Sequence, residues 1–295
     1  MNIDVIVAGG SYAGMSAALQ VARARRQVLV IDAGVRRNRF ADAAHGLLGH
    51  DGRPPADIAA DARTQLLAYP NVRWIDARAT RAEPAGEGFR ITTDGGETQE
   101  GRRLVLAVGV TDTLPDIPGL AERWGRHVFH CPYCHGYELD NGQLGVLATG
   151  EMAIHQALLV PDWGPTTLFT NGVFEPDADH RAQLAARGVA VETVPVREIA
   201  GARAVVCLED GRRVELDGLF TAPRVHPAGG LAEQLGCALE EGPLGTFIRT
   251  DAMQATSVPN VFACGDAARA TGSLPFAVAD GAMAGAAAHR SLIFT

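Results

Sequence analysis

The stretch "IDVIVAGGSYAGMSAALQVARARRQVLVIDAG", residues 3–34, predicts a strand, a glycine-rich turn, a helix and a second strand. Ile3–Val7 and Val28–Ile31 are short, continuous apolar runs, whereas Met15–Arg25 has the apolar spacing of a helix. Continuous apolar strands on either side of a helix are typical of a parallel sheet that is covered on both faces. The stretch therefore predicts an α/β fold that begins with a β-α-β unit.

The turn of this unit, "GGSYAG", matches the dinucleotide-binding fingerprint except that Ser11 replaces the middle glycine. Gly9 permits the tight turn and Gly14 lets the helix pack close to the strand, while the small Ser11 still lets a pyrophosphate approach the helix N-terminus. Asp32 ends the second strand, where an acid accepts a hydrogen bond from a ribose hydroxyl. We predict a bound adenine dinucleotide, the alternative being a glycine turn in an empty domain. The predicted contacts are Gly9, Gly10, Ser11, Tyr12, Ala13, Gly14 and Asp32.

The bulk composition excludes several classes of protein. The length of 295 residues favours two domains, and a formal net charge of −8 argues against nucleic acid as a partner. No apolar run reaches the roughly 18 residues that a membrane span needs. The N-terminal "MNIDVIVAGG" enters a strand without a basic or cleavable leader. We therefore expect a cytoplasmic protein with neither a membrane nor a nucleic-acid partner.

A second β-α-β unit follows in "QLGVLATGEMAIHQALLV", residues 143–160, with Leu144–Ala148 as the strand and Ala153–Val160 as the helix. The strand "TTLFT", residues 166–170, completes it. Residues 36–56 are rich in Arg, Gly, His and Pro and predict a long functional loop. The other predicted helices are 57–68 and 178–187, and the other predicted strands are 72–75, 89–93, 104–108 and 189–194.

"VFHCPYCHGYE", residues 128–138, permits three interpretations: a zinc site, a haem attachment site or a redox dithiol. Zinc needs four ligands, and a second Cys-x-x-Cys half is missing, although His127, His130 and His135 are near. Haem attachment requires export, for which the sequence has no signal. We therefore favour a redox dithiol of Cys131 and Cys134, with no metal. The remaining cysteines, Cys207, Cys237 and Cys264, predict ordinary packing.

Two further motifs carry a resemblance to a known family. "NVFACGDAA", residues 260–268, resembles the second flavin motif of flavoproteins with two dinucleotide domains, and "LVLAVG", residues 104–109, resembles their crossover strand. With the fingerprint and the Cys-x-x-Cys, they make nearly the whole chain similar to low-molecular-weight thioredoxin reductases. The resemblance implies a homodimer that binds FAD. It also implies two Rossmann-like, three-layer ββα domains: an FAD domain, residues 1–113 and 226–295, and an inserted NAD(P)-binding-like domain, residues 114–225, with the dithiol.

The same resemblance assigns further cofactor contacts. It places Asp266 on the ribityl chain and aims the N-terminus of a helix from about Phe276 at the pyrimidine edge of the flavin. His45 lies in "HGLLGHDG", residues 45–52, a segment that resembles the border of the flavin site. His50 and Asp51 are further candidates there, the alternative being a solvated turn. The contacts implied in this way are His45, Gly265, Asp266, Phe276 and Ala277.

Within the family, "CPYCHGYE" is most similar to FAD-dependent dithiol oxidases, which close disulfides in natural products such as gliotoxin and the dithiolopyrrolones. Three departures from the reductases point the same way. Ala148 replaces the leading glycine of the second nucleotide motif, and Asn171-Gly172 stand where reductases place a basic cluster for NADPH. "LPFA", residues 274–277, replaces Arg-Gln-Ala near the flavin.

The resemblance also gives the cysteines their roles: Cys134 faces the flavin and Cys131 exchanges with substrate. A Cys-x-x-Cys at the start of a helix predicts lowered thiol pKa values, through exposed N–H groups and the helix dipole. His135 stands where reductases carry a proton-shuttling Asp, and histidine titrates near neutrality. His130 is a second catalytic candidate, with a structural role as its alternative.

We therefore expect an enzyme that oxidises a small-molecule dithiol to a disulfide, passing electrons through Cys131–Cys134 and FAD to oxygen and giving hydrogen peroxide. One alternative is a thioredoxin-disulfide reductase that uses NADPH and a thioredoxin-like partner. Another takes electrons from a protein donor such as ferredoxin. A third, from a different class, is a non-catalytic flavoprotein or redox sensor.

Overall fold

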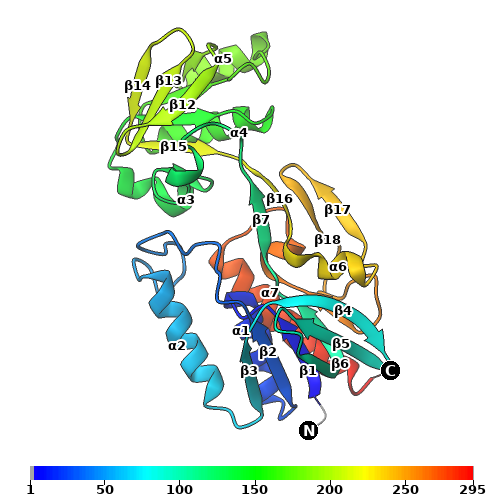
Figure 1. Cartoon of the computed structure of the whole chain (residues 1–295). Coiled ribbons are helices and arrows are strands. Elements are labelled where there is room, and N and C mark those ends of the chain that lie inside the picture. Colours follow the sequence, from blue (N-terminus) through cyan, green and yellow to red (C-terminus); the bar gives the residue numbers. More distant parts are fainter. Residues whose placement is uncertain (1–2, 295) are drawn as a thin grey trace. The chain divides into compact units, whose positions relative to one another are not determined.

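Residues 3–294 are described by a computed structural model in which the chain forms two units (Figure 1). The flanking unit comprises Met1–Arg39, Leu47–Thr111 and Val225–Thr295, and the inserted unit comprises Phe40–Gly46 and Asp112–Arg224. The chain passes from one unit to the other within two residues of the boundaries predicted from the sequence. The short segment Phe40–Gly46 lies outside the predicted inserted domain, and it belongs to the inserted unit by its contacts.

The flanking unit is built on a seven-stranded sheet. Its parallel strands run in the order β3-β2-β1-β6, with β19 also parallel to β6, and β4 and β5 extend β6 as an antiparallel meander. The parallel pairing of β1 with β2 and the tight turn after β1 are the predicted β-α-β geometry. The strands are β1 (Ile3–Ala8), β2 (Val28–Asp32), β3 (Val72–Asp76), β4 (Ala79–Ala85), β5 (Gly88–Thr93), β6 (Thr98–Leu106) and β19 (Val261–Ala263).

Both faces of this sheet are buried because alternate residues of each strand enter different apolar clusters. Val5 and Val7 pack with helices α1 (Tyr12–Arg23) and α7 (Leu274–Ser291). Ile6 and Ala8 pack with the meander and the short helix α6 (Leu231–Gln234). The flanking unit therefore has three layers: helices, parallel sheet and meander.

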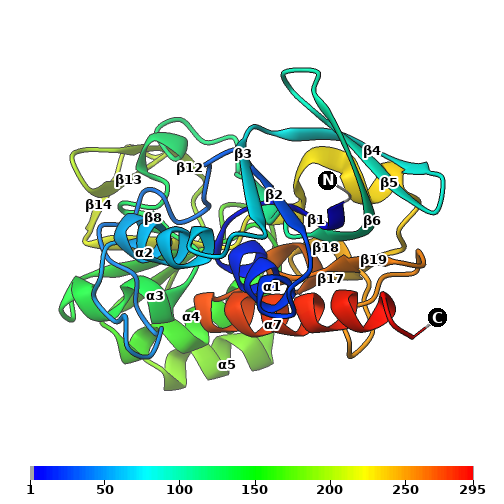
Figure 2. The ribbon, with the colours of Figure 1, turned by 90° about the horizontal axis from the view of Figure 1, so that it is seen from below.

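Helices α1 and α7 lie side by side against one face of the sheet (Figure 2). Their backbones approach so closely that a Cβ added to Gly281 would overlap the carbonyl oxygen of Ala13, and one added to Gly285 would overlap that of Ala17. The small-residue C-terminal helix predicted from the sequence thus packs on the helix of the glycine fingerprint. The flanking unit also contains α2 (Pro55–Leu67). A further sheet has the order β17-β18-β16-β7, and its strands are β7 (Val110–Thr113), β16 (Arg224–Pro227), β17 (Leu239–Gly242) and β18 (Gly245–Ile248). The end of β7 and the first residue of β16 belong to the inserted unit, and the rest of this sheet belongs to the flanking unit.

The inserted unit repeats the three-layer plan. A parallel sheet of order β11-β10-β9-β15-β8 has helices α4 and α5 on one face and the antiparallel sheet β12-β13-β14 on the other. The elements are β8 (Val128–Phe129), α3 (Pro132–His135), β9 (Leu144–Leu147), α4 (Met152–Leu159), β10 (Thr166–Phe169), α5 (Ala178–Ala186), β11 (Ala190–Glu192), β12 (Val196–Ala200), β13 (Ala204–Leu208), β14 (Arg213–Leu216) and β15 (Gly218–Thr221).

The predicted fold class, α/β with two Rossmann-like, three-layer ββα domains, is confirmed. One local prediction needs correction. Helix α1 starts at Tyr12, three residues before the predicted start, so the fingerprint itself forms its first turn. The helix after Cys131 has only four residues. Among residues 3–294, no helix is both long enough and apolar enough to cross a lipid bilayer.

Candidate active site

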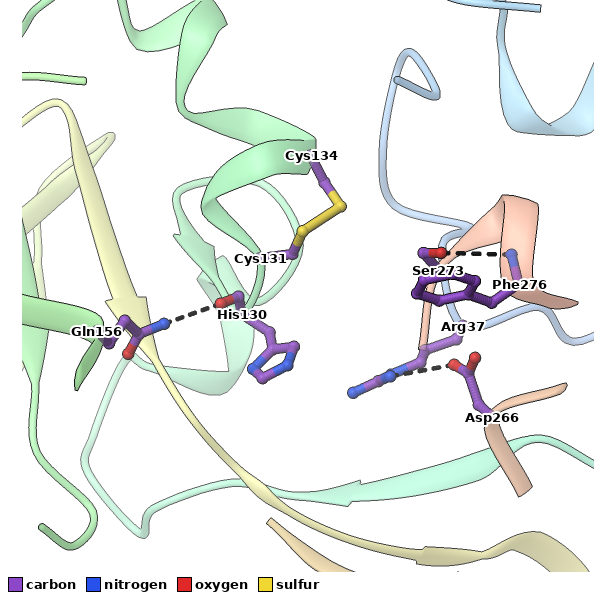
Figure 3. The surroundings of a disulfide bond; sticks show 8 residues. All are labelled: Arg37, His130, Cys131, Cys134, Gln156, Asp266, Ser273 and Phe276. Carbon is purple, nitrogen blue, oxygen red and sulfur yellow. Dashed lines mark hydrogen bonds and ion pairs between the residues drawn. A yellow bond between two sulfur atoms is a disulfide. The ribbon is translucent and has the colours of Figure 1, made fainter. Parts of the chain in front are cut away.

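Cys131 and Cys134 form a disulfide at α3, with their Cα atoms 5.3 Å apart (Figure 3). Cys131 occupies the N-cap position and Pro132 the first helical position, where a missing N–H costs nothing. The four residues of α3 make a single turn. The helix dipole therefore lowers the thiol pKa values less than a longer helix would. The predicted redox dithiol is therefore present as a closed disulfide.

His135 follows Cys134 and is largely buried. Its ring stacks on Phe129, with centroids 4.3 Å apart and planes 22° from parallel, and Phe129 in turn lies 5.8 Å from the ring of Phe220. Burial, and secondarily the charge of His45, lowers the pKa of His135 to about 4. His135 is therefore a neutral imidazole at pH 7, the form that can accept a proton from a thiol.

This lowered pKa predicts a loss of stability in acid. An unfolded histidine titrates near 6.5, so between pH 6.5 and pH 4 the unfolded chain binds more protons at His135 than the folded chain does. We expect this group alone to lower the free energy of unfolding by about 2 kcal/mol between pH 7 and pH 5. Urea unfolding of wild type and His135→Phe at both pH values measures the difference. His180→Phe, at a half-exposed histidine of α5, is the control. A wild-type loss no larger than that of His135→Phe would contradict the assignment.

The backbone just before Cys131 is fixed by α4. The Nε2 of buried Gln156 donates to the carbonyl oxygen of His130 over 2.8 Å, as Figure 3 shows. Gln156 Oε1 is also buried, and within residues 3–294 it accepts no hydrogen bond. The carbonyl contact describes a structural role for His130, and its catalytic role stays a prediction.

Aromatic side chains surround the dithiol helix. Tyr133, between the two cysteines, is 70% exposed and meets Trp163 edge to face, with ring centroids 5.2 Å apart. Gly136 follows the helix, and a Cβ there would lie 2.6 Å from the indole of Trp163. The glycine of "CHGYE" is therefore required by packing, because any side chain would displace Trp163.

In the flanking unit the glycine fingerprint has the predicted form. Gly9 has φ +102°, and a Cβ on it would overlap the carbonyl oxygen of Ala107. The N–H of Gly10 donates to Asp32 Oδ1 over 2.9 Å, so Asp32 is oriented toward the fingerprint. Trp74 of β3 closes one side, because a Cβ on Gly10 would overlap its indole. The first turn of α1 keeps backbone N–H groups without intrahelical acceptors, which suits a pyrophosphate.

The second flavin motif lies in the same unit. Gly265, with φ +69°, opens a short 3₁₀ helix, Gly265–Ala268, that also contains Asp266. Arg37 Nη1 lies 3.1 Å from Asp266 Oδ2. The neighbouring Arg36 has a buried Nε that makes no hydrogen bond within residues 3–294. A buried donor of this kind suits an acceptor on a bound anionic group.

The start of α7 is stabilised by a side-chain cap and by contacts of an arginine. Ser273 Oγ accepts from the N–H of Phe276 over 3.4 Å, and the Phe276 ring, 47% exposed, lies 4.6 Å from the guanidinium of Arg269. Arg269 also binds the nearly fully buried Asp280 in a two-pronged ion pair. Phe276 and Ala277, predicted near the flavin, thus stand on a fixed first turn of α7.

His45 and His50, from the stretch of residues 45–52, belong to different units. His45 Nε2 lies 3.4 Å from Glu138 Oε1, and both residues belong to the inserted unit. His50 Nδ1 lies 3.1 Å from Arg53 Nη1 in the flanking unit. The predicted flavin contact of His45, and the choice for His50 and Asp51 between such a contact and a solvated turn, stay predictions.

Three residues lie at these sites but were not predicted from the sequence, namely Arg37, Trp74 and Glu138. Arg37 lay within the arginine-rich loop that was predicted to be functional, and Glu138 closes the quoted dithiol motif. Trp74 had no local signal, because its contact with Gly10 arises from strand order. Among residues 3–294, no three His, Cys, Asp or Glu side chains are grouped to hold a metal ion.

A redox-active disulfide in one Rossmann-like unit and a dinucleotide fingerprint in another define a class, the two-domain disulfide oxidoreductases. The family profile described as pyridine nucleotide-disulphide oxidoreductase matches residues 3–281, and the chain belongs to this family. It is therefore a thiol–disulfide oxidoreductase, and membership implies a flavin cofactor.

Several known proteins are similar over their whole length. The thioredoxin reductase tcpT of Claviceps purpurea is 36% identical, covering 99% of this chain and 94% of its own. A solved oxidoreductase from Agrobacterium tumefaciens is 58% identical with a TM-score of 0.97, covering 100% of this chain and 99% of its own. The structure of HlmI is 36% identical with a TM-score of 0.91, covering 99% of this chain and 93% of its own.

Proposed function

We propose that this protein is an FAD-dependent dithiol oxidase, which closes a disulfide in a small molecule and passes the electrons to oxygen with formation of hydrogen peroxide. The observation that carries the proposal is the second nucleotide motif, in the inserted unit. The polar side chains of this motif either hydrogen-bond to the protein's own backbone or carry a negative charge, which disfavours the phosphates of a nicotinamide dinucleotide.

The turn between β9 and α4 is the place where such a dinucleotide would put its pyrophosphate. Ala148 directly follows β9, where the motif expects glycine, and the hydroxyl of Thr149 donates to the carbonyl oxygen of Ala222 over 2.7 Å. Glu151 is exposed at the N-cap of α4. Its carboxylate places negative charge where a phosphate needs positive potential.

The end of β10 lacks a ribose contact. Asn171 has φ +52°, and its Oδ1 accepts from the N–H of Val196 over 2.7 Å. The side chain therefore supports a turn. Neither an acid for NADH nor a basic residue for NADPH follows β10 at this position, which is occupied by Asn171-Gly172.

The flanking unit, by contrast, suits FAD. The amide groups of α1 would hold the pyrophosphate, Asp32 the adenosine ribose and Asp266 the ribityl chain. Arg36 offers its buried Nε as a further donor. The start of α7, at Phe276 and Ala277, would border the isoalloxazine. Bound there, FAD supplies two-electron chemistry linked to oxygen.

The dithiol chemistry belongs to the chain's own residues. Neutral His135 takes the proton of a substrate thiol, and the resulting thiolate attacks Cys131, so that Cys134 leaves as a thiolate. The second substrate thiol then attacks the mixed disulfide and releases Cys131. The substrate has formed one S–S bond, and the enzyme disulfide has gained two electrons.

Anaerobic mixing tests this proposal. Because the nicotinamide contacts are replaced, we expect dithiothreitol to bleach the flavin absorbance at least about a hundredfold faster than NADPH or NADH at equal concentration, a difference of roughly 3 kcal/mol in barrier. Admission of air is expected to restore the flavin spectrum with one peroxide per dithiol.

Rapid reduction by NADPH followed by reduction of thioredoxin would overturn the proposal in favour of a thioredoxin reductase. Reduction by ferredoxin alone would favour a protein donor. A flavin spectrum that no dithiol changes would identify a non-catalytic flavoprotein.

A further inference from the structure

The backbone that enters the dithiol turn lies just beyond the parallel sheet of the inserted unit. Strand β8 is two residues long, and its pairing with β15 ends at Phe129. His130 follows this pairing and directly precedes Cys131. Past that point the turn is closed by its own backbone, because the N–H of Cys134 donates to the carbonyl oxygen of Cys131 over 3.2 Å. His130 is therefore the place where another element can hold the turn against the sheet.

Gln156 of α4 makes this contact. Its Nε2 donates to the carbonyl oxygen of His130 over 2.8 Å (Figure 3). Gln156 is only 8% exposed, and its neighbours on the helix, Ala153 and Ala157, are buried in the same apolar cluster as Phe129. The amide thus reaches the entry of the dithiol turn from a helix that is packed on the sheet.

The Gln156 amide contributes little to stability. Its Oε1 is buried, and among residues 3–294 no donor bonds to it. A buried acceptor without a donor costs at least about as much free energy as one hydrogen bond gains. One contact made and one missing therefore nearly cancel, whereas the contact that is made falls on the peptide group next to a reactive cysteine.

We propose that Gln156 is a positioning residue for the dithiol, which holds the backbone at Cys131 so that the disulfide closes readily and is harder to reduce. A peptide group is planar, so a fixed carbonyl at His130 also fixes the N and Cα atoms of Cys131. In the disulfide the Cα atoms of Cys131 and Cys134 are 5.3 Å apart, within the range that such a bond needs. Holding two thiols near this geometry raises their effective concentration and favours the closed form. The proposal rests on the dithiol exchange proposed above.

The exchange that measures this effect is balanced. Dithiothreitol loses two electrons and two protons and becomes its cyclic disulfide. The Cys131–Cys134 disulfide gains the same two electrons and two protons and becomes two thiols. Its equilibrium constant therefore compares the open and closed forms of the dithiol directly.

This equilibrium tests the role of Gln156. Holoenzyme is equilibrated anaerobically with mixtures of reduced and oxidised dithiothreitol and quenched with N-ethylmaleimide, and labels on Cys131 and Cys134 are counted by mass. Gln156→Met fills similar space without a donor. We expect its equilibrium constant for opening the disulfide to be about fivefold larger than that of wild type, the factor that one net hydrogen bond supplies. This factor corresponds to a reduction potential about 20 mV higher. Its melting temperature is expected to stay within about 3 °C of wild type.

A shorter amide supplies the matched variant. Gln156→Asn keeps the amide but loses one methylene, so its nitrogen no longer reaches the carbonyl of His130, and we expect it to behave as Gln156→Met does. Gln183→Met, at an exposed glutamine of α5, is the control and is expected to match wild type. An equilibrium constant equal to that of wild type in either Gln156 variant overturns the proposal. Melting temperatures lower by more than about 3 °C in both variants would mean a merely structural role and also overturn it.

The readout keeps this proposal separate from the enzyme's overall reaction. Labelling measures the equilibrium at Cys131–Cys134 whether the electrons later go to oxygen or arrive from another donor. Absence of peroxide therefore overturns the oxidase assignment alone, whereas an unchanged equilibrium in the Gln156 variants overturns the role of Gln156 alone.

Discussion

Replacing Cys134 with serine is expected to lower turnover of dithiothreitol by about a thousandfold or more, since loss of a covalent nucleophile typically removes most of the rate enhancement. Without its sulfur the Cys131–Cys134 disulfide cannot form, so no electrons can be stored between substrate and flavin. Oxygen consumption and peroxide formation measure the loss. Flavin content and melting temperature are expected to stay unchanged, because Cys134 is only half-buried.

Two companion variants sharpen this result. Cys207→Ala removes a buried cysteine outside the disulfide and is expected to keep turnover. Cys131→Ser leaves one sulfur at position 134, and a long-wavelength charge-transfer band is expected there and not in Cys134→Ser. Turnover of Cys134→Ser within tenfold of wild type would contradict a role for the disulfide, and a band in Cys134→Ser alone would exchange the roles of the two sulfurs.

Replacing Arg269 with methionine is expected to lower the free energy of unfolding by about 3 kcal/mol, because it leaves the carboxylate of Asp280 buried without its partner. The Asp280 side chain is only 5% exposed, and Arg269 holds both of its oxygens. The same change removes the guanidinium from the Phe276 ring. A melting temperature lower by roughly 6–10 °C is expected for a chain of this size.

The opposite substitution gives the contrast. Asp280→Asn removes the buried charge and leaves Arg269, whose side chain is 36% exposed and can be hydrated, so we expect a loss below about 1 kcal/mol. The double change Arg269→Met with Asp280→Leu is expected to recover most of the stability, as buried pairs replaced by apolar residues often do. If Arg269→Met and Asp280→Asn lower the free energy of unfolding equally, the loss comes from breaking the ion pair and not from leaving the Asp280 carboxylate buried without a partner.

The sequence predicted the β-α-β units well because their signal is local. The apolar runs of β1, β2, β9 and β10 mark strands that are buried on both faces, and glycine positions mark the turns after them. Gly9 and Gly14 were predicted to be needed for tight packing, and an added Cβ at either would overlap backbone. The Cys131–Cys134 pair was likewise predicted from the Cys-x-x-Cys spacing.

What the sequence did not reveal depends on distant partners. Arg37 meets Asp266 across 229 positions of sequence, and Gly10 is required partly by Trp74 from another strand. The contact of His45 with Glu138 was likewise not predicted, because the two residues lie far apart in the sequence. No local pattern distinguishes a loop residue that stays with its own unit from one that packs elsewhere.

The close packing of α7 on α1 through Gly281 and Gly285 determines the order in which the two units can finish folding during translation. The inserted unit's main segment, Asp112–Arg224, is continuous and can form its parallel sheet while the ribosome is still making the rest. The helix-covered face of the flanking sheet must wait for residues 274–291, the last helix to emerge. Until then the apolar face of α1 and the sheet stays uncovered. We expect chaperone dependence and aggregation of nascent chains to be concentrated in this interval.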